Sequence, residues 1–267
     1  MSVFAFDRAI VRAPAPSVVN GLRAGDGETP SYEGVLAEHC AYVAALEAAG
    51  LRVEQVPALD AFPDSLFVED PAFVIPEGAV LLNPGARSRA GEAAEIEPVL
   101  RANFGRVARL LAGHADGGDI LILPDEILIG LSARTDREGA EAFVALMAEW
   151  GRRASIVETP RGVLHLKTGC GLLDDDAVLA TPALAEAAMF GDLGVIVTPP
   201  GEEGAANLLR VNDTVLLAAG FPRTAELIAG RGYAPVLLET EQIARIDAGL
   251  SCMSLRWLSG SGSSDRA

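Results

Sequence analysis

Cysteine and histidine are scarce in this sequence, and both residue types could carry chemistry. The cysteines are Cys40, Cys170 and Cys252, and an odd, widely spread set without a CxxC pair indicates neither a disulfide framework nor a metal site. Cys252 lies in DAGLSC near the end of the chain, where it could be a small core side chain or, as a thiolate, a nucleophile. His165 lies at the centre of VLHLK, which is predicted as a strand, and could be a buried core residue or a general acid–base.

Acidic residues gather in two further segments. PDSLFVEDP places Asp64, Glu69 and Asp70 around the apolar run SLFV, which is predicted as a strand. Carboxylates at such a strand end are either solvated or form a pocket for a cation, because a buried carboxylate persists when it is paired with a charge. HADGGDIL places Asp116 and Asp119 at the start of another predicted strand, after glycines that permit close backbone approach.

Two segments carry arginines next to predicted turns. Arg134, in GLSARTDREGAE, lies between a strand and a helix, and PGARSR contains Arg87 and Arg89. An arginine in such a loop can be simply solvated, or it can hold a carboxylate with two parallel hydrogen bonds. Each of these segments, taken alone, has an ordinary structural explanation.

The composition excludes several classes of partner. With 21 basic and 37 acidic residues the formal net charge is −16, which argues against binding to nucleic acid or to an anionic membrane surface. We find no signal peptide, no membrane-spanning run and no glycine-rich nucleotide-binding loop. Few cysteines in a chain of this kind favour a reducing compartment, so a cytoplasmic location is expected.

The elements that must position these residues alternate between short strands and helices. Helices are predicted over residues 32–50 and 137–151, and residues 91–113 are predicted to be helical at both ends with a break at Gly105. Residues 119–132 are predicted to form a hairpin turned at PDE. About five strand–strand–helix–strand groups fit the chain, and five-fold β/α repetition is allowed but not required by this pattern.

The segments PDSLFVEDP, PGARSR, DGGDIL, GLSARTDREGAE, HLKTGC and DAGLSC, in this order and spacing, closely resemble those of dimethylarginine dimethylaminohydrolases. The resemblance covers about residues 8–257. It implies an α/β fold of the pentein type, a five-bladed β/α propeller with pseudo-five-fold ββαβ repeats. We therefore expect one catalytic domain over residues 1–258, followed by a disordered polar tail over residues 259–267.

The resemblance also implies a role for individual residues. The nucleophile is expected at Cys252, the general acid–base at His165 and the acidic member of the catalytic set at Asp116. Acidic groups that contact the substrate are expected at Asp64, Glu69 and Asp70, and two arginines that bind its carboxylate are expected at Arg89 and Arg134. A leucine of the lid is expected at Leu22, and a backbone carbonyl that contacts the substrate is expected at Ile246.

The activity implied is hydrolysis of Nω-methylated arginine to citrulline and an alkylamine through a covalent cysteine intermediate. The substrate would be asymmetric dimethylarginine or monomethylarginine. No metal or organic cofactor is expected, the partner is a small cationic amino acid, and the chain is expected to be a monomer or a homodimer.

Three other functions remain open at this point. An arginine or agmatine deiminase would share the cysteine, histidine and acids, although agmatine has no carboxylate for Arg89 and Arg134 to bind. A non-catalytic pentein that only binds a partner would not need Cys252, His165 and Asp116 together. An unrelated thiol hydrolase or a zinc protein is disfavoured because no close metal-ligand spacing is present.

Overall fold

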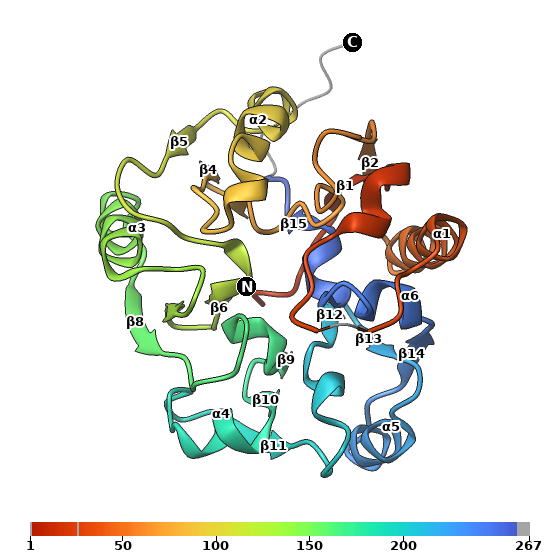
Figure 1. Cartoon of the computed structure of the whole chain (residues 1–267). Helices are drawn as coiled ribbons and strands as arrows, with labels where there is room; N and C mark the ends of the chain where they lie inside the picture. The colour runs from red at the N-terminus through yellow and green to blue at the C-terminus, as the bar shows by residue number, and fades with distance from the viewer. Residues whose placement is uncertain (1, 26, 261–267) are drawn as a thin grey trace.

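The computed structural model describes residues 2–25 and 27–260 as five three-stranded sheets arranged around a central axis (Figure 1). In every sheet the inner strand is antiparallel to the middle strand, and the middle strand is parallel to the outer one. A helix connects the middle and outer strands, so each sheet and its helix form one ββαβ blade. The predicted five-bladed β/α propeller is therefore confirmed.

The first blade joins the two ends of the chain. Its middle strand is β1 (Arg8–Arg12), its outer strand is β2 (Arg52–Val56), and α1 (Tyr32–Ala48) connects them. Its inner strand, β15 (Leu255–Trp257), is the last strand within the described residues. The segment just before β15, which carries Cys252, is therefore drawn beside the axis when the ring closes.

The other four blades follow one another along the chain. They comprise β3 (Ala72–Ile75), β4 (Gly78–Leu81), α2 (Glu92–Asn103) and β5 (Val107–Arg109); β6 (Ile120–Ile122), β7 (Ile127–Leu131), α3 (Arg137–Glu149) and β8 (Ala154–Glu158); β9 (Cys170–Asp174), β10 (Ala177–Ala180), α4 (Pro182–Glu186) and β11 (Gly194–Val197); and β12 (Leu209–Val211), β13 (Thr214–Ala218), α5 (Pro222–Ala229) and β14 (Pro235–Leu238).

Short helical segments complete the connections. They are η1 (Pro16–Asn20), η2 (Arg87–Arg89), η3 (Gly117–Asp119), η4 (Leu166–Thr168), η5 (Glu203–Ala206), α6 (Glu241–Ala244) and η6 (Leu250–Met253). Among these, η3, η4 and η6 each precede the inner strand of a blade, so their residues lie near the axis.

Apolar side chains fill the space between neighbouring blades. One buried cluster joins Val11 of β1 and Leu46 of α1 to Leu216 of β13, and another joins Ile10 of β1 to Ile96 of α2. Because no blade buries its apolar surface alone, the ring is held together by this packing, and the loops at the axis are fixed relative to one another.

The predicted helices over 32–50 and 137–151 are confirmed as α1 and α3. A side chain caps the start of each helix. Ser31 Oγ accepts from the Gly34 amide at 3.0 Å before α1, and Asp136 Oδ1 accepts from the Gly139 amide at 2.7 Å before α3. The predicted hairpin over 119–132 is confirmed as β6 and β7. The helix expected in the second half of residues 91–113 is wrong, because that part pairs with β4 as strand β5 and gains hydrogen bonds from it.

Two predicted strands are also wrong. SLFV lies in a series of turns, in which the Phe67 amide donates to the Asp64 carbonyl at 2.9 Å. VLHLK does not form a strand, because His165 is the residue just before η4 and its carbonyl accepts from the Thr168 amide at 3.0 Å. In both segments local turn hydrogen bonds replace those of a sheet.

The end of the chain extends past β15. Ser259 donates its amide to Asp7 Oδ1 at 2.6 Å, which ties this residue to the start of the chain. Residues 261–267 of the expected tail lie outside the described residues. Within the part of the chain that the structure describes, no helix combines the length and apolar character needed to cross a membrane.

Candidate active site

The predicted site residues converge because several occupy equivalent places in successive blades. Asp70, Asp116, His165 and Cys252 each come shortly before an inner strand, namely β3, β6, β9 and β15. The entrances to the inner strands meet around the axis, so residues one blade apart in sequence become neighbours in space.

A cavity of about 140 Å³ lies at this meeting point. Nine of the ten predicted residues line it, and these are Leu22, Asp64, Asp70, Arg89, Asp116, Arg134, His165, Ile246 and Cys252. Among these nine residues, a thiol, an imidazole, several carboxylates and two guanidinium groups therefore face one cavity.

Glu69 is the exception, and its expected contact with substrate stays a prediction. Its Oε1 lies 2.6 Å from Lys167 Nζ and 3.4 Å from Arg256 Nη2, and it lines a second cavity that none of the nine other residues reaches. Glu69 and Asp70 are adjacent in the chain but line different cavities. The carboxylate of Glu69 is paired with cations of the protein itself.

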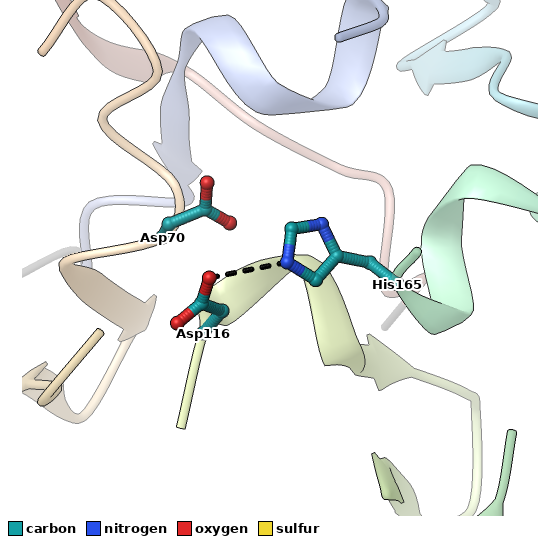
Figure 2. Close-up of side chains that lie close together, drawn as sticks. All are labelled: Asp70, Asp116 and His165. Carbon is teal, nitrogen blue, oxygen red and sulfur yellow. Dashed lines mark hydrogen bonds and ion pairs between the residues drawn. The ribbon is translucent and has the colours of Figure 1, made fainter. Parts of the chain in front are cut away.

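His165 and Asp116 form the central polar contact of the cavity (Figure 2). His165 Nε2 lies 3.1 Å from Asp116 Oδ2, and Asp116 Oδ1 accepts from the Gly85 amide at 2.7 Å. Burial alone would lower the pKa of His165, but the carboxylates of Asp70, Asp116 and Asp119 outweigh it and raise that pKa to about 9. His165 is therefore protonated at neutral pH and can act as an acid.

Gly118, in DGGD, leaves room for this arrangement. A β-carbon at Gly118 would lie 2.8 Å from the His165 ring and 3.0 Å from Asp70 Oδ1. The backbone of the glycine pair can therefore approach where no larger residue fits, which is the use that the sequence suggested for these glycines.

Asp70 and Arg89 form a buried ion pair at the wall of the cavity. Arg89 Nη1 donates to Asp70 Oδ2, and Asp70 Oδ1 accepts from the Gly118 amide at 3.1 Å. Burial would raise the pKa of Asp70, but Arg89 and His165 outweigh that effect and hold it below its usual value. Asp70 is therefore ionised, and it presents negative charge beside His165.

The two predicted carboxylate-binding arginines differ in how much they can still donate. The guanidinium of Arg89 also donates to both oxygens of Glu92 and to the carbonyls of Asp64 and Phe67, which leaves one of its five N–H groups unassigned. Among the described residues, the guanidinium of Arg134 has no hydrogen-bond or ion-pair partner, and it is only partly buried. Arg134 thus retains its full capacity to bind an anion.

Asp64 connects the cavity to the segment with Leu22. Its Oδ1 accepts from the Leu22 amide at 2.9 Å, and burial raises the pKa of Asp64, with Arg89 and this hydrogen bond opposing the rise. Two residues after Leu22, the Ala24 amide donates to Asp247, which also lines the cavity. The Leu22 segment is thereby hydrogen-bonded to two carboxylates that line the cavity.

Cys252 lies in η6 with a partly exposed side chain. Desolvation, together with the nearby carboxylates of Glu69 and Asp70, raises the pKa of the thiol to about 12, and Lys167 opposes this rise. The neutral thiol is therefore favoured at physiological pH. A cation bound in the cavity would offset the two carboxylates and favour the thiolate.

Asp70, Asp116 and His165 also offer ligand atoms within 4.8 Å of one another. Metal binding requires a neutral imidazole and available carboxylates, whereas His165 has a raised pKa and Asp70 is bound by Arg89. This set of groups suits proton transfer and the binding of a cationic N–H donor better than the binding of a metal ion.

Comparison with known proteins agrees with this geometry. A family model described as arginine deiminase matches residues 46–199. The chain is 39% identical to the N(G),N(G)-dimethylarginine dimethylaminohydrolase of Pseudomonas aeruginosa over 254 residues, which cover 94% of this chain and 100% of that protein. The chain belongs to the dimethylarginine dimethylaminohydrolase family. The Streptomyces coelicolor protein of the same name is 33% identical over 252 residues, 93% of this chain and 96% of that protein.

The family membership extends to the fold. A solved structure of the Pseudomonas aeruginosa enzyme, a Cys-to-Ser variant complexed with citrulline, matches with a TM-score of 0.91 and 38% identity, covering 95% of this chain and 100% of that one. The resemblance drawn from the sequence segments is therefore confirmed.

Some residues of the cavity were not predicted from the sequence. They are Arg23, Ala24, Phe67, Leu164 and Ala248. Each adjoins or nearly adjoins a predicted residue in the chain, which is the one signal that the sequence offered. Nothing in their own types distinguishes them from ordinary loop or core residues.

Proposed function

We propose that this protein hydrolyses Nω-methylated arginine to citrulline and an alkylamine, with Cys252 as the nucleophile. The observation that carries the proposal is the single cavity that joins the Cys252 thiol, the His165–Asp116 pair and the free guanidinium of Arg134. Membership of the dimethylarginine dimethylaminohydrolase family and the citrulline in the related bacterial structure support it.

The cavity suits a molecule with a cation at one end and an amino-acid group at the other. Asp70 and Asp116 would accept hydrogen bonds from the guanidinium N–H groups, which keeps the group charged and fixed. Arg134, with the one remaining N–H of Arg89, would bind the α-carboxylate. Asp64 and the carbonyls of Leu22 and Ile246 would bind the α-amino group.

The first half of the reaction forms a covalent adduct. As the cation binds, Cys252 loses its proton to water, and Sγ attacks the central guanidinium carbon to form a tetrahedral adduct. The bond from this carbon to the methylated nitrogen then breaks, and His165 supplies the proton with which the alkylamine leaves. The raised pKa of His165 keeps that proton available at neutral pH.

The second half releases the product. The first step leaves an S-alkylthiouronium on Cys252, and His165 is now neutral. A water molecule attacks the same carbon while His165 takes one of its protons. The carbon–sulfur bond then breaks, which restores the cysteine and releases citrulline.

Unsubstituted arginine is the second candidate substrate. The family model that matches residues 46–199 is described as arginine deiminase, and the same groups would process plain arginine with ammonia as the leaving group. Methyl groups alone change binding by only about 1–3 kcal/mol in a typical apolar pocket, so discrimination must be measured.

The test is a product assay with three substrates. The protein is incubated with asymmetric dimethylarginine, arginine and agmatine, and citrulline and carbamoylputrescine are measured. We expect citrulline from dimethylarginine and a loss of about 10⁴-fold or more in the Cys252→Ser variant. Absence of any ureido product would reject hydrolase activity, and a fully active Cys252→Ser variant would reject the nucleophile.

A further inference from the structure

Asp119, the second aspartate of DGGD, has no part in the reaction proposed above, yet its carboxylate contacts the segment that carries His165. Asp119 is completely buried at 0% exposure. Its Oδ1 accepts from the amide of Leu166, the residue directly after His165, at 2.9 Å. The carboxylate of the third blade therefore holds the start of η4, which leads into the fourth blade.

The other oxygen of the same carboxylate reaches the turn that carries Arg134. Asp119 Oδ2 accepts from the hydroxyls of Ser132 and Thr135, both at 2.7 Å. The Ser132 oxygen in turn accepts a hydrogen bond from the Arg134 amide at 3.0 Å, and the Thr135 oxygen accepts one from the Asp116 amide at 3.1 Å. The Asp119 carboxylate is thus linked to the backbone of Arg134 through the Ser132 hydroxyl, and to the backbone of Asp116 through the Thr135 hydroxyl.

These contacts demand an acceptor that carries no proton. The Ser132 oxygen also accepts from the Thr135 amide at 3.2 Å, so both of its lone pairs are in use and its proton must point to Asp119. The Leu166 amide and the Thr135 hydroxyl are donors as well. A carboxylate accepts all three bonds, whereas an amide at this position would direct N–H groups at atoms that are themselves donors.

We propose that Asp119 is a positioning residue that holds His165, Asp116 and Arg134 in one fixed arrangement. Arg134 binds one end of the substrate and the His165–Asp116 pair acts at the other. Asp119 therefore fixes the position of the carboxylate-binding arginine relative to the pair that transfers the proton. This inference rests on the function proposed above. Asp119 touches no substrate, so its effect passes through the backbone and hydroxyl groups that it bonds.

The charges around His165 decide which variants can test the idea. They come from Asp70, Asp116 and Asp119, and the other charged or titratable groups of the cavity are Arg23, Asp64, Arg89, Arg134, Asp247 and Cys252. Replacing Asp119 removes a charge as well as a geometry. Thr135→Val keeps every charge and removes the hydroxyl that links Asp119 to the Asp116 amide, and Thr135→Ser restores that hydroxyl.

Glu202 and Thr224 provide a matched control that does not line the cavity. Glu202 Oε2 accepts from the Thr224 amide and hydroxyl, both at 2.7 Å, and its Oε1 accepts from the Arg223 amide at 3.2 Å. Glu202 and Thr224 are buried, like Asp119 and Thr135, with 5% and 0% of their surface exposed. Glu202→Gln and Thr224→Val therefore reproduce the loss of a buried carboxylate network whose hydrogen bonds go to no residue of the cavity.

The experiment combines steady-state kinetics on dimethylarginine with an NMR pH titration of the His165 ring. We expect Asp119→Asn to lower kcat/KM by about 10²-fold and Thr135→Val by about 10-fold, because small displacements of catalytic groups carry such costs. In Thr135→Val the His165 midpoint should fall by about 0.5–1 pH unit as the bond to Asp116 loosens. Thr135→Ser should keep the wild-type values, and the two control variants should keep both readouts.

The two proposals fail in different ways. If the wild-type protein forms no ureido product, the proposed function is rejected, and the His165 titration still decides the role of Asp119. An unchanged midpoint in Thr135→Val overturns the positioning role. Equal shifts in Thr224→Val or Glu202→Gln overturn it as well, because they would mean that general destabilisation moves His165.

Discussion

His165 and Asp116 lie just before the inner strands of neighbouring blades, and a 3.1 Å contact joins their side chains between these two blades. Neither residue has the other as a neighbour in the chain. Their contact exists because η3 and η4 enter the ring side by side, and it places a protonated imidazole beside two carboxylates. The consequences for stability and reactivity can be measured.

The raised pKa of His165 predicts a specific dependence of stability on pH. An unfolded histidine titrates near pH 6.5, whereas the folded pKa is about 9, so proton binding favours the folded state. This contribution, roughly 3 kcal/mol at most, is fully present below about pH 6.5 and is lost as the pH rises through about 9. Urea unfolding at pH 6, 8 and 9.5 should show a steeper decline for wild type than for His165→Asn, and parallel declines would contradict the prediction.

The neutral thiol of Cys252 predicts selective reactivity towards cations. At pH 7 a neutral haloacetamide should alkylate Cys252 slowly, since the pKa of the thiol is raised to about 12. A haloamidine of similar size carries a positive charge that offsets Glu69 and Asp70, so we expect its reaction to be at least about 10-fold faster. Peptide mass spectrometry locates the label, and the exposed Cys40 serves as the internal control because it should not discriminate in this way. Equal rates at Cys252 would contradict the electrostatic account.

Arg134 should determine recognition of the carboxylate end. Loss of a charged hydrogen-bond partner costs about 1.5–3 kcal/mol, so Arg134→Gln should raise KM for dimethylarginine by about 10- to 100-fold with a smaller change in kcat. Arg137→Gln is the matched control, because Arg137 is a nearby exposed arginine paired only with Glu158. A KM for Arg134→Gln equal to that of the control would show that this guanidinium does not bind the substrate.

Gly118 should tolerate no side chain. Gly118→Ala places a β-carbon 2.8 Å from the His165 ring, so the ring must move, and we expect kcat/KM to fall by about 10²-fold. Gly105→Ala is the control, since a β-carbon there meets no atom within 4 Å. Kinetics and thermal unfolding of both variants check the result, and a fully active Gly118→Ala protein would argue against the tight placement of His165.

Much of the fold could be predicted from the order of elements in the sequence. The helices over 32–50 and 137–151 and the hairpin over 119–132 follow from local periodicity and turn residues, which tertiary contacts do not override here. Strand β5 was mistaken for helix because three residues carry little pattern, and its pairing with β4 decides its conformation. The segments SLFV and VLHLK alternate like strands but turn instead, since their polar groups bond within the segment.

The sequence by itself determined the set of reactive groups at the site: a cysteine, a histidine, acids and arginines in family-specific segments. Tertiary structure decided which groups face the cavity and in what state. Glu69 and Asp70 are adjacent in the chain, yet Glu69 pairs with Lys167 and lines another cavity, whereas Asp70 pairs with Arg89 at the wall of the site. Arg89 and Arg134 are the same residue type, but only Arg134 keeps its guanidinium free among the described residues. The physical reason is that direction, burial and pKa depend on neighbours from other blades, and those neighbours meet only when the ring closes.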